Sequence, residues 1–153
     1  MLCPGPPQAS LQVIDARDQA AWAVGLVERG VAGAFHACSP TRPWSLSDLV
    51  QAAAAALGGA LDGALDPVWV PAEQLAGLGV DGSVFPLWSE GADEGAMAMD
   101  PGAATGTGLS PRPIQQTIRE TYAWMQEHPW QRDGVGLSAT REAELFRTLA
   151  PGG

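Results

Sequence analysis

The chain has 153 residues, enough for one domain with an apolar core. Apolar residues make up 46% of the sequence, charged residues only 16%, and the formal net charge is −9. Because an acidic chain repels phosphate backbones, nucleic acid is not an expected partner. The basic residues other than histidine are all arginines, so the sequence contains no lysine.

Two cysteines, Cys3 and Cys38, lack the CxxC spacing and the clustered histidines of a zinc site or a redox dithiol. We expect two reduced thiols, with a disulfide between them as the alternative. Residues 1–7 lack the positive region and apolar run of a signal peptide. Glycines and an aspartate interrupt the alanine-rich stretch 50–65, so no membrane span is expected. These features together predict a cytoplasmic protein.

The predicted elements begin after a Pro/Gly-rich segment, residues 1–10, which we expect to be disordered or coil. Residues 11–14 (Leu-Gln-Val-Ile) predict a short strand. A helix follows, because Asp15 is a good N-cap and Gly30 a good stop. Three apolar residues are predicted to share one face of this helix: Trp22, Leu26 and Val27.

A second strand is predicted at residues 33–38 (Gly-Ala-Phe-His-Ala-Cys), whose small residues are typical of a strand buried in an α/β sheet. Ser45 and Asp48 form a predicted capping box at the start of a helix that ends at the glycines 58–59. Residues 67–71 (Pro-Val-Trp-Val-Pro) predict a short edge strand, since proline cannot donate to a sheet.

The remaining chain is predicted to alternate short elements with glycine-rich loops. A short helix through residues 75–78 precedes a loop region at 79–95, and residues 96–99 predict a further strand. Amphipathic helices are predicted over about 114–127 and about 138–149.

Five pieces in chain order carry a resemblance to a known family. They are Val-Ile-Asp-Ala-Arg-Asp at 13–18, Gly-Ala-Phe-His at 33–36, Ser-Leu-Ser-Asp-Leu at 45–49, the segment 100–109 with Arg112-Pro113, and Thr117, Thr121 and Trp124. In this order they resemble the second half of extended short-chain dehydrogenase/reductases, the NAD-dependent epimerase/dehydratase family. No single piece is specific, whereas their order is.

The resemblance implies an α/β fold (α+β when isolated): the C-terminal, substrate-binding part of an extended Rossmann-type enzyme. Residues 11–128 would form the substrate-side domain, and residues 129–153 a C-terminal helical extension and tail. The complete family enzyme is an oxidoreductase or epimerase that uses NAD or NADP on a small-molecule substrate. Its nucleotide-binding half normally precedes the Val-Ile-Asp piece, and here ten residues precede residue 11.

The family's chemistry also requires a tyrosine with a lysine four residues later, and this chain has no such pair. The sole tyrosine is Tyr122, and position 126 is Gln. Residues 102–108 match the GxxxGxG spacing of a phosphate loop, but Pro111 and Pro113 follow at once and no βαβ unit begins there. We interpret 102–108 as a short capped helical turn. We therefore expect neither catalytic nor cofactor-binding residues, no metal site, and no NAD(P) binding by this chain alone.

Four residues are candidates for contact with a substrate, each with a structural alternative. His36 stands at the end of a predicted strand, where clefts form, or is a hydrogen-bonded structural histidine. Arg17 contacts substrate, or it forms a structural ion pair or helix cap with Asp18. Trp88 lines an apolar pocket or fills the core. Gln12, a polar residue in a strand pattern, is open to both roles.

The family resemblance leaves three hypotheses. The chain is the substrate-binding portion of an NAD(P)-dependent enzyme, a non-catalytic module that binds a ligand or self-associates through a bare sheet edge, or a gene remnant. Sugar-nucleotide epimerases of the family often carry an arginine just before the first strand. Residues 10–12 (Ser-Leu-Gln) lack it, so a smaller or more apolar substrate is expected.

Overall fold

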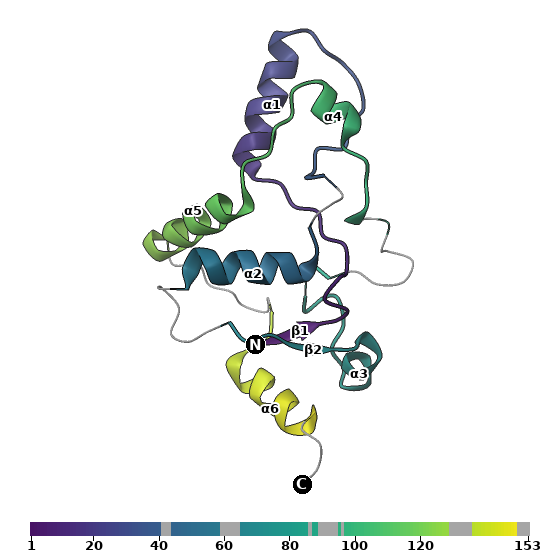
Figure 1. Ribbon diagram of the computed structural model, residues 1–153, viewed down its shortest axis with the longest axis vertical. Helices are drawn as coiled ribbons and strands as arrows, with labels where there is room; N and C mark the ends of the chain where they lie inside the picture. Colours follow the sequence, from purple (N-terminus) through teal and green to yellow (C-terminus); the bar gives the residue numbers. More distant parts are fainter. Residues whose placement is uncertain are drawn as a thin grey trace.

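The computed structural model describes residues 1–40, 44–58, 65–85, 87–88, 95, 97–128 and 136–149. Its elements, in chain order, are β1 (Leu2–Pro4), α1 (Ala16–Glu28), α2 (Leu46–Leu57), β2 (Val68–Val70), α3 (Ala72–Gly77), α4 (Gly102–Gly106), α5 (Ile114–Glu127) and α6 (Ala139–Leu149). Figure 1 shows an elongated arrangement, with α1 and α4 at one end, β1, β2, α3 and α6 at the other, and α2 and α5 between them.

The two strands pair in parallel, with Leu2 opposite Val68 and Pro4 opposite Val70. The predicted edge strand at 67–71 is therefore confirmed as β2. Its partner β1 lies in the segment expected to be coil, and that expectation was wrong. The pairing joins positions 66 residues apart, so nothing in the local Pro/Gly-rich sequence signals it. The chain is a helix-rich α/β mixture with this parallel pair.

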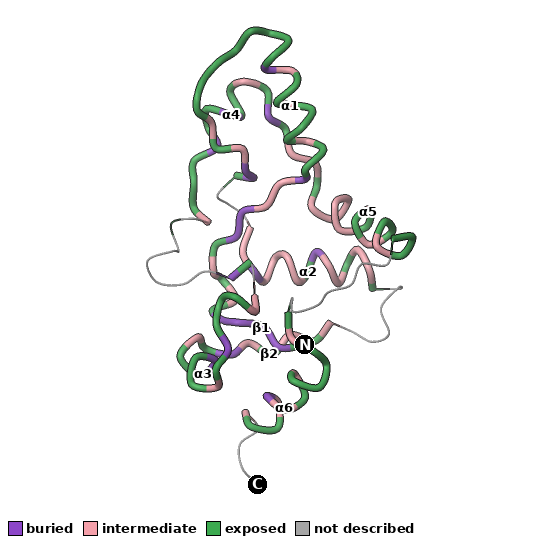
Figure 2. Tube along the Cα trace, turned by 180° about the vertical axis from the view of Figure 1, so that it is seen from behind, coloured by how far each residue is buried: buried purple, intermediate pink, exposed green. Residues whose placement is uncertain are grey.

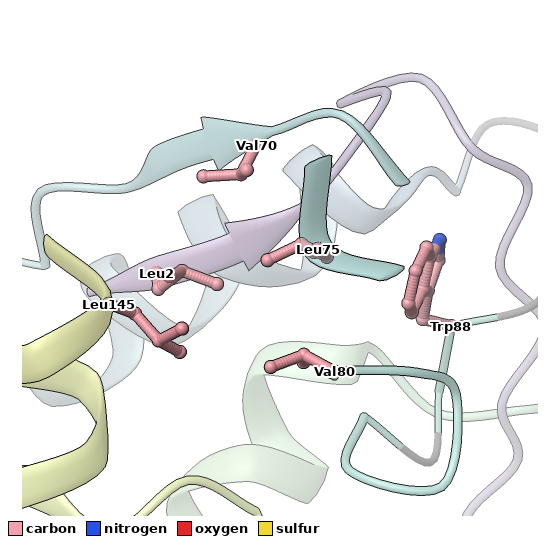
Figure 3. Close-up of a cluster of buried hydrophobic side chains, with 6 residues drawn as sticks. All are labelled: Leu2, Val70, Leu75, Val80, Trp88 and Leu145. Atoms are coloured by element: carbon pink, nitrogen blue, oxygen red, sulfur yellow. The ribbon is translucent and has the colours of Figure 1, made fainter. Parts of the chain in front are cut away.

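The main apolar core lies around this strand pair, as Figure 3 shows. Its buried members come from both strands, α3, the loop after it and α6: Leu2, Val70, Leu75, Val80, Trp88 and Leu145. Figure 2 shows that the burial is uneven, because α1 and α6 are exposed along much of their length. The two ends of the chain, β1 and α6, thus meet in one core.

Helix α1 begins and ends as its sequence predicts. Asp15 is its N-cap and accepts a hydrogen bond from the backbone N–H of Arg17, and Gly30 follows the helix with a φ of +65°. The predicted apolar face was only partly right. Leu26 is buried, whereas Val27, about 100° further round the helix, is 81% exposed.

Helix α2 begins at the predicted capping box: Ser45 Oγ accepts from the backbone N–H of Asp48, and Asp48 Oδ2 accepts from that of Ser45. It packs against α5 in the middle of the molecule. Helices α4, α5 and α6 lie where the sequence predicts them. No helix within the described residues is long and apolar enough to cross a membrane.

Three predicted strands are absent from the described residues. Residues 11–14 form no strand, although Ser10 makes an isolated bridge to Ser45. Residues 33–38 form neither helix nor strand, and half of them are exposed. Residues 97–99 form no strand either, and Ala96 lies outside the described residues. A strand needs a neighbour to complete its hydrogen bonds, and these segments have none within the described chain.

Candidate functional site

A cavity of about 880 Å³ opens between β1, the start of α2, the loop at 79–88 and the start of α6. Its size falls within the range of small-molecule sites, roughly 300–1,000 Å³. Most of its lining is apolar, including Leu2, Leu46, Val80, Val84, Phe85 and Trp88. The cavity therefore suits a small molecule with a largely apolar surface.

The aromatic wall of the cavity comes from the loop after α3. Gly79, with a φ of +71°, ends α3, and the backbone N–H of Val80 bonds back to the carbonyl of Leu75. Phe85 and Trp88 meet edge to face, with ring centroids 6.2 Å apart and an interplanar angle of 80°. Trp88 is 6% exposed and is itself a member of the core cluster, as Figure 3 shows. The core thus holds the aromatic wall in place.

An Asx turn shapes the same loop. Asp81 Oδ1 accepts hydrogen bonds from the backbone N–H of Ser83 at 2.9 Å and from its hydroxyl. The Ser83 bonds lower the pKa of Asp81. The backbone N–H of Val84 then bonds to the carbonyl of Asp81. This turn brings Val84 to the cavity lining by local hydrogen bonding alone.

The polar groups of the cavity lie on β1 and the first turn of α6. Glu142 Oε1 accepts from the backbone N–H of Leu2 at 2.6 Å. Arg141 donates to the carbonyl of Leu78 at 2.9 Å and pairs with Glu144 at 3.2 Å. These bonds tie α6 to β1 and to the end of α3. The side chains of Glu142 and Arg141 therefore hold the walls of the cavity together. Both residues also line the cavity, so they would border a bound ligand.

Cys3 lines the cavity from β1 and is buried. Burial is the main cause that raises the pKa of its thiol, opposed by the nearby N-terminal amine. A raised pKa keeps the group as a thiol, which is a poor nucleophile. Cys38 is also buried, and both cysteines are free, so the disulfide alternative is wrong in this structure.

Trp88 is the one predicted substrate residue that lines this cavity, and it also belongs to the buried core, so both of its alternatives describe its position. Gln12 is buried elsewhere, and its amide nitrogen donates to the carbonyls of Ser39 at 3.0 Å and Met99 at 2.7 Å. Its amide oxygen accepts from the backbone N–H of Met99 at 2.8 Å. Gln12 thus bridges three coil segments. This position agrees with the structural role that was the alternative to substrate contact.

Arg17 lies at the start of α1 and takes part in an ion-pair network. It pairs with Asp15 at 2.6 Å and with Glu120 of α5 at 2.5 Å. The expected pair between Arg17 and Asp18 was wrong, because Asp18 pairs with Arg112 instead. Arg112 donates to Asp18 from its backbone N–H, Nε and Nη2 at 2.8, 2.9 and 2.6 Å.

The network lowers the pKa of both aspartates. Hydrogen bonding by Arg17 is the main cause for Asp15, with Thr117 Oγ1 donating a further bond at 2.8 Å. Hydrogen bonding by Arg112 is the main cause for Asp18. Sequence reasoning missed these contacts, because Asp18 and Arg112 lie 94 residues apart.

His36 is exposed and does not line the cavity. The strand predicted at 33–38 does not form. The predicted position of His36, at a strand end beside a cleft, was therefore wrong. Sequence reasoning missed the cavity residues of β1 and α6, which are brought together only by the fold. Among the described residues, no group of His, Cys, Asp and Glu side chains is arranged to hold a metal ion.

The glycine-rich segment 102–108 contains the five-residue helix α4, and Gly108 follows it with a φ of +98°. This is the short helical turn that the sequence predicts. Tyr122 is half-buried on α5. Comparison of the chain with family models, curated proteins and solved structures finds no match.

Proposed function

We propose that this chain is the C-terminal, substrate-binding portion of an NAD(P)-dependent epimerase, dehydratase or reductase of the extended short-chain dehydrogenase/reductase type. The cavity beside Trp88 receives the substrate, and it is the observation that carries this proposal. The nucleotide-binding half, with its NAD or NADP, comes from residues preceding this sequence or from a separate chain. The 153 residues alone are inactive.

The ion-pair network supports the family resemblance. Asp15 and Asp18 belong to the first of the five resembling pieces, whereas Arg112 and Thr117 belong to the last two. Three hydrogen bonds join Asp18 to Arg112, and one joins Thr117 to Asp15. Pieces recognised separately in the sequence thus meet at one place in the fold.

In the proposed enzyme, this chain binds the substrate and the cofactor of the other half supplies the chemistry. Phe85 and the largely buried Trp88 line the apolar side of the cavity, and the first turn of α6 borders its polar side. The Cys3 thiol, with its raised pKa, is no nucleophile. These residues bind and orient a substrate and exclude water from it. The bound cofactor of the complete enzyme supplies the hydride chemistry.

A thermal-shift assay with small apolar ketones and alcohols tests the cavity directly. A ligand that binds only the folded chain stabilises it by about 2.7 kcal/mol at a hundred times its Kd. Val84→Trp fills the cavity and should abolish the stabilisation. Val68→Trp, at an exposed valine of β2 that does not line the cavity, should preserve it. A shift that survives Val84→Trp would place the ligand elsewhere.

A non-catalytic ligand-binding module derived from the same family is the second candidate. It is favoured by the same cavity, together with the absence of a Tyr–Lys pair in the sequence. The DNA upstream of Met1 separates the two candidates. A GxxGxxG strand-turn-helix and a YxxxK motif there, or in a neighbouring gene, supports the enzyme. Unrelated upstream sequence supports the module.

A further inference from the structure

Helix α1 is apolar on two opposite sides. At about 100° per residue, one side carries five exposed apolar residues, which we call the outer face: Ala16, Ala20, Ala23, Val24 and Val27. Val24 and Val27 are 58% and 81% exposed. The opposite side carries Trp22 and the buried Leu26.

Only the inner side is covered by the described chain. Trp22 donates to Thr107 Oγ1 at 3.1 Å and meets Phe35 edge to face at 5.5 Å. A helix face made of contiguous apolar residues is normally packed against another surface.

Helix α5 adds an aromatic residue beside this face. Thr117 and Glu120 reach Asp15 and Arg17 at the start of α1, so that side of α5 faces α1. Trp124 lies one turn further along the same side and is 54% exposed. Figure 1 shows α5 leaving the start of α1 on the side away from α4. The outer face of α1 and Trp124 of α5 therefore border the angle between these two helices, which we call the corner.

We propose that a second copy of this chain occupies the corner, through an antiparallel, two-fold pair of α1 helices. Arg17 and Glu28 flank the outer face on one side, near its two ends. A two-fold antiparallel pair places Arg17 of each copy beside Glu28 of the other, making two opposite-charge contacts. A parallel two-fold pair would instead place these flanks on opposite sides of the interface and would make neither contact. The Arg17 side chain is half-exposed even within its own ion pairs.

The shapes of the outer face fit the same arrangement. In the antiparallel register, Ala20 lies opposite Val24, and Ala16 lies opposite Val27. The alanines of one helix thus lie opposite the valines of the other, which lets the two helices approach closely. The alternative register that pairs valines with valines would hold the helices apart.

The area of the interface requires α5 as well. A stable interface buries about 800 Å² per partner, more than one thirteen-residue helix face offers. In the two-fold pair, Trp124 of each copy lies beneath the end of the other α1, near Val27. An aromatic side chain buries roughly 150–250 Å². Trp124 therefore enlarges an interface that stays small, and a small interface predicts a weak, reversible dimer.

Sedimentation of the full chain across micromolar concentrations tests this proposal, which does not rest on the proposed function. We expect a concentration-dependent dimer, and Val27→Asp should raise its Kd at least tenfold, about 1.4 kcal/mol. Val68→Asp is the matched control, because it adds the same charge at an exposed valine near the other end of the molecule. It should leave the Kd unchanged.

Glu28→Arg provides a second variant, since it turns both opposite-charge contacts into like-charge contacts and should also weaken the dimer. A chain that stays monomeric at every concentration would overturn the proposal and leave the corner to another partner, such as the nucleotide-binding half. A dimer unaffected by Val27→Asp and by Glu28→Arg would overturn it equally.

Discussion

Asp15 is the residue on which the contacts at the start of α1 converge. Its side chain is 4% exposed, caps α1, pairs with Arg17 and accepts from Thr117. The capping role can be predicted from the sequence, because it is local. The ion pairs of Arg17 with Glu120 and of Asp18 with Arg112 cannot be predicted, because the partners lie far apart in the sequence. Long-range charge pairing leaves no mark on sequence spacing.

Substituting Asp15 separates these two roles. Asp15→Ala removes the cap and the charge and should cost roughly 2 kcal/mol of unfolding free energy. Asp15→Asn keeps a capping oxygen and loses only the charge, so its cost should be smaller. Denaturant titration measures both. The control, Asp81→Asn, alters an exposed turn. Equal losses for Asp15→Ala and Asp15→Asn would show that the charge alone matters.

The network also predicts how stability depends on pH. Asp15 and Asp18 have folded pKa values below their unfolded value of about 3.9. The unfolded chain therefore binds protons first as the pH falls. Their contribution is complete above about pH 5 and is lost as the pH drops toward the folded values. Unfolding free energies measured down to acid pH should show this loss, and Asp15→Asn should reduce it.

At the scale of elements, helices were predicted better than strands. The helix starting at Ser45 is encoded locally by its capping box, and so is the stop at Gly30. The strands expected at 11–14 and 33–38 depend on neighbours that the described chain does not supply. Conversely, β1 forms in an unpromising segment because β2 pairs with it.

Gln12 holds the segments that do not form strands. Gln12→Ala would leave the buried carbonyl of Ser39 and the part-buried amide of Met99 without their partner, at a cost of about 1–3 kcal/mol. Gln51→Ala is the control, because it removes an exposed side-chain bond on α2. A stable Gln12→Ala variant that loses ligand binding would return Gln12 to the role of a substrate contact.

At the scale of the whole molecule, the cavity and the outer face of α1 lie toward opposite ends of an elongated chain (Figure 1). Of the predicted site residues, Trp88 alone lines the cavity. The others lie elsewhere because the cavity is assembled from β1 and α6, the two ends of the sequence. No local sequence pattern predicts that β1 and α6 come together around a cavity.

The separation of the two surfaces predicts independent effects. Val27→Asp should weaken dimerisation while leaving the ligand-induced thermal shift unchanged. Val84→Trp should abolish that shift and leave the dimer intact. Measuring both properties for both variants checks this, and loss of both properties in either variant would mean that the surfaces are coupled.

We propose that this chain supplies the substrate side of a nucleotide-dependent enzyme and holds no nucleotide site of its own. The glycine-rich stretch 102–108 contains a five-residue helix rather than opening a long one, and the sequence has no lysine. Calorimetric titration of the 153-residue chain with NAD⁺ and with NADP⁺ tests this proposal. We expect no stoichiometric heat with either dinucleotide, and a stoichiometric binding isotherm with one of them would overturn the proposal.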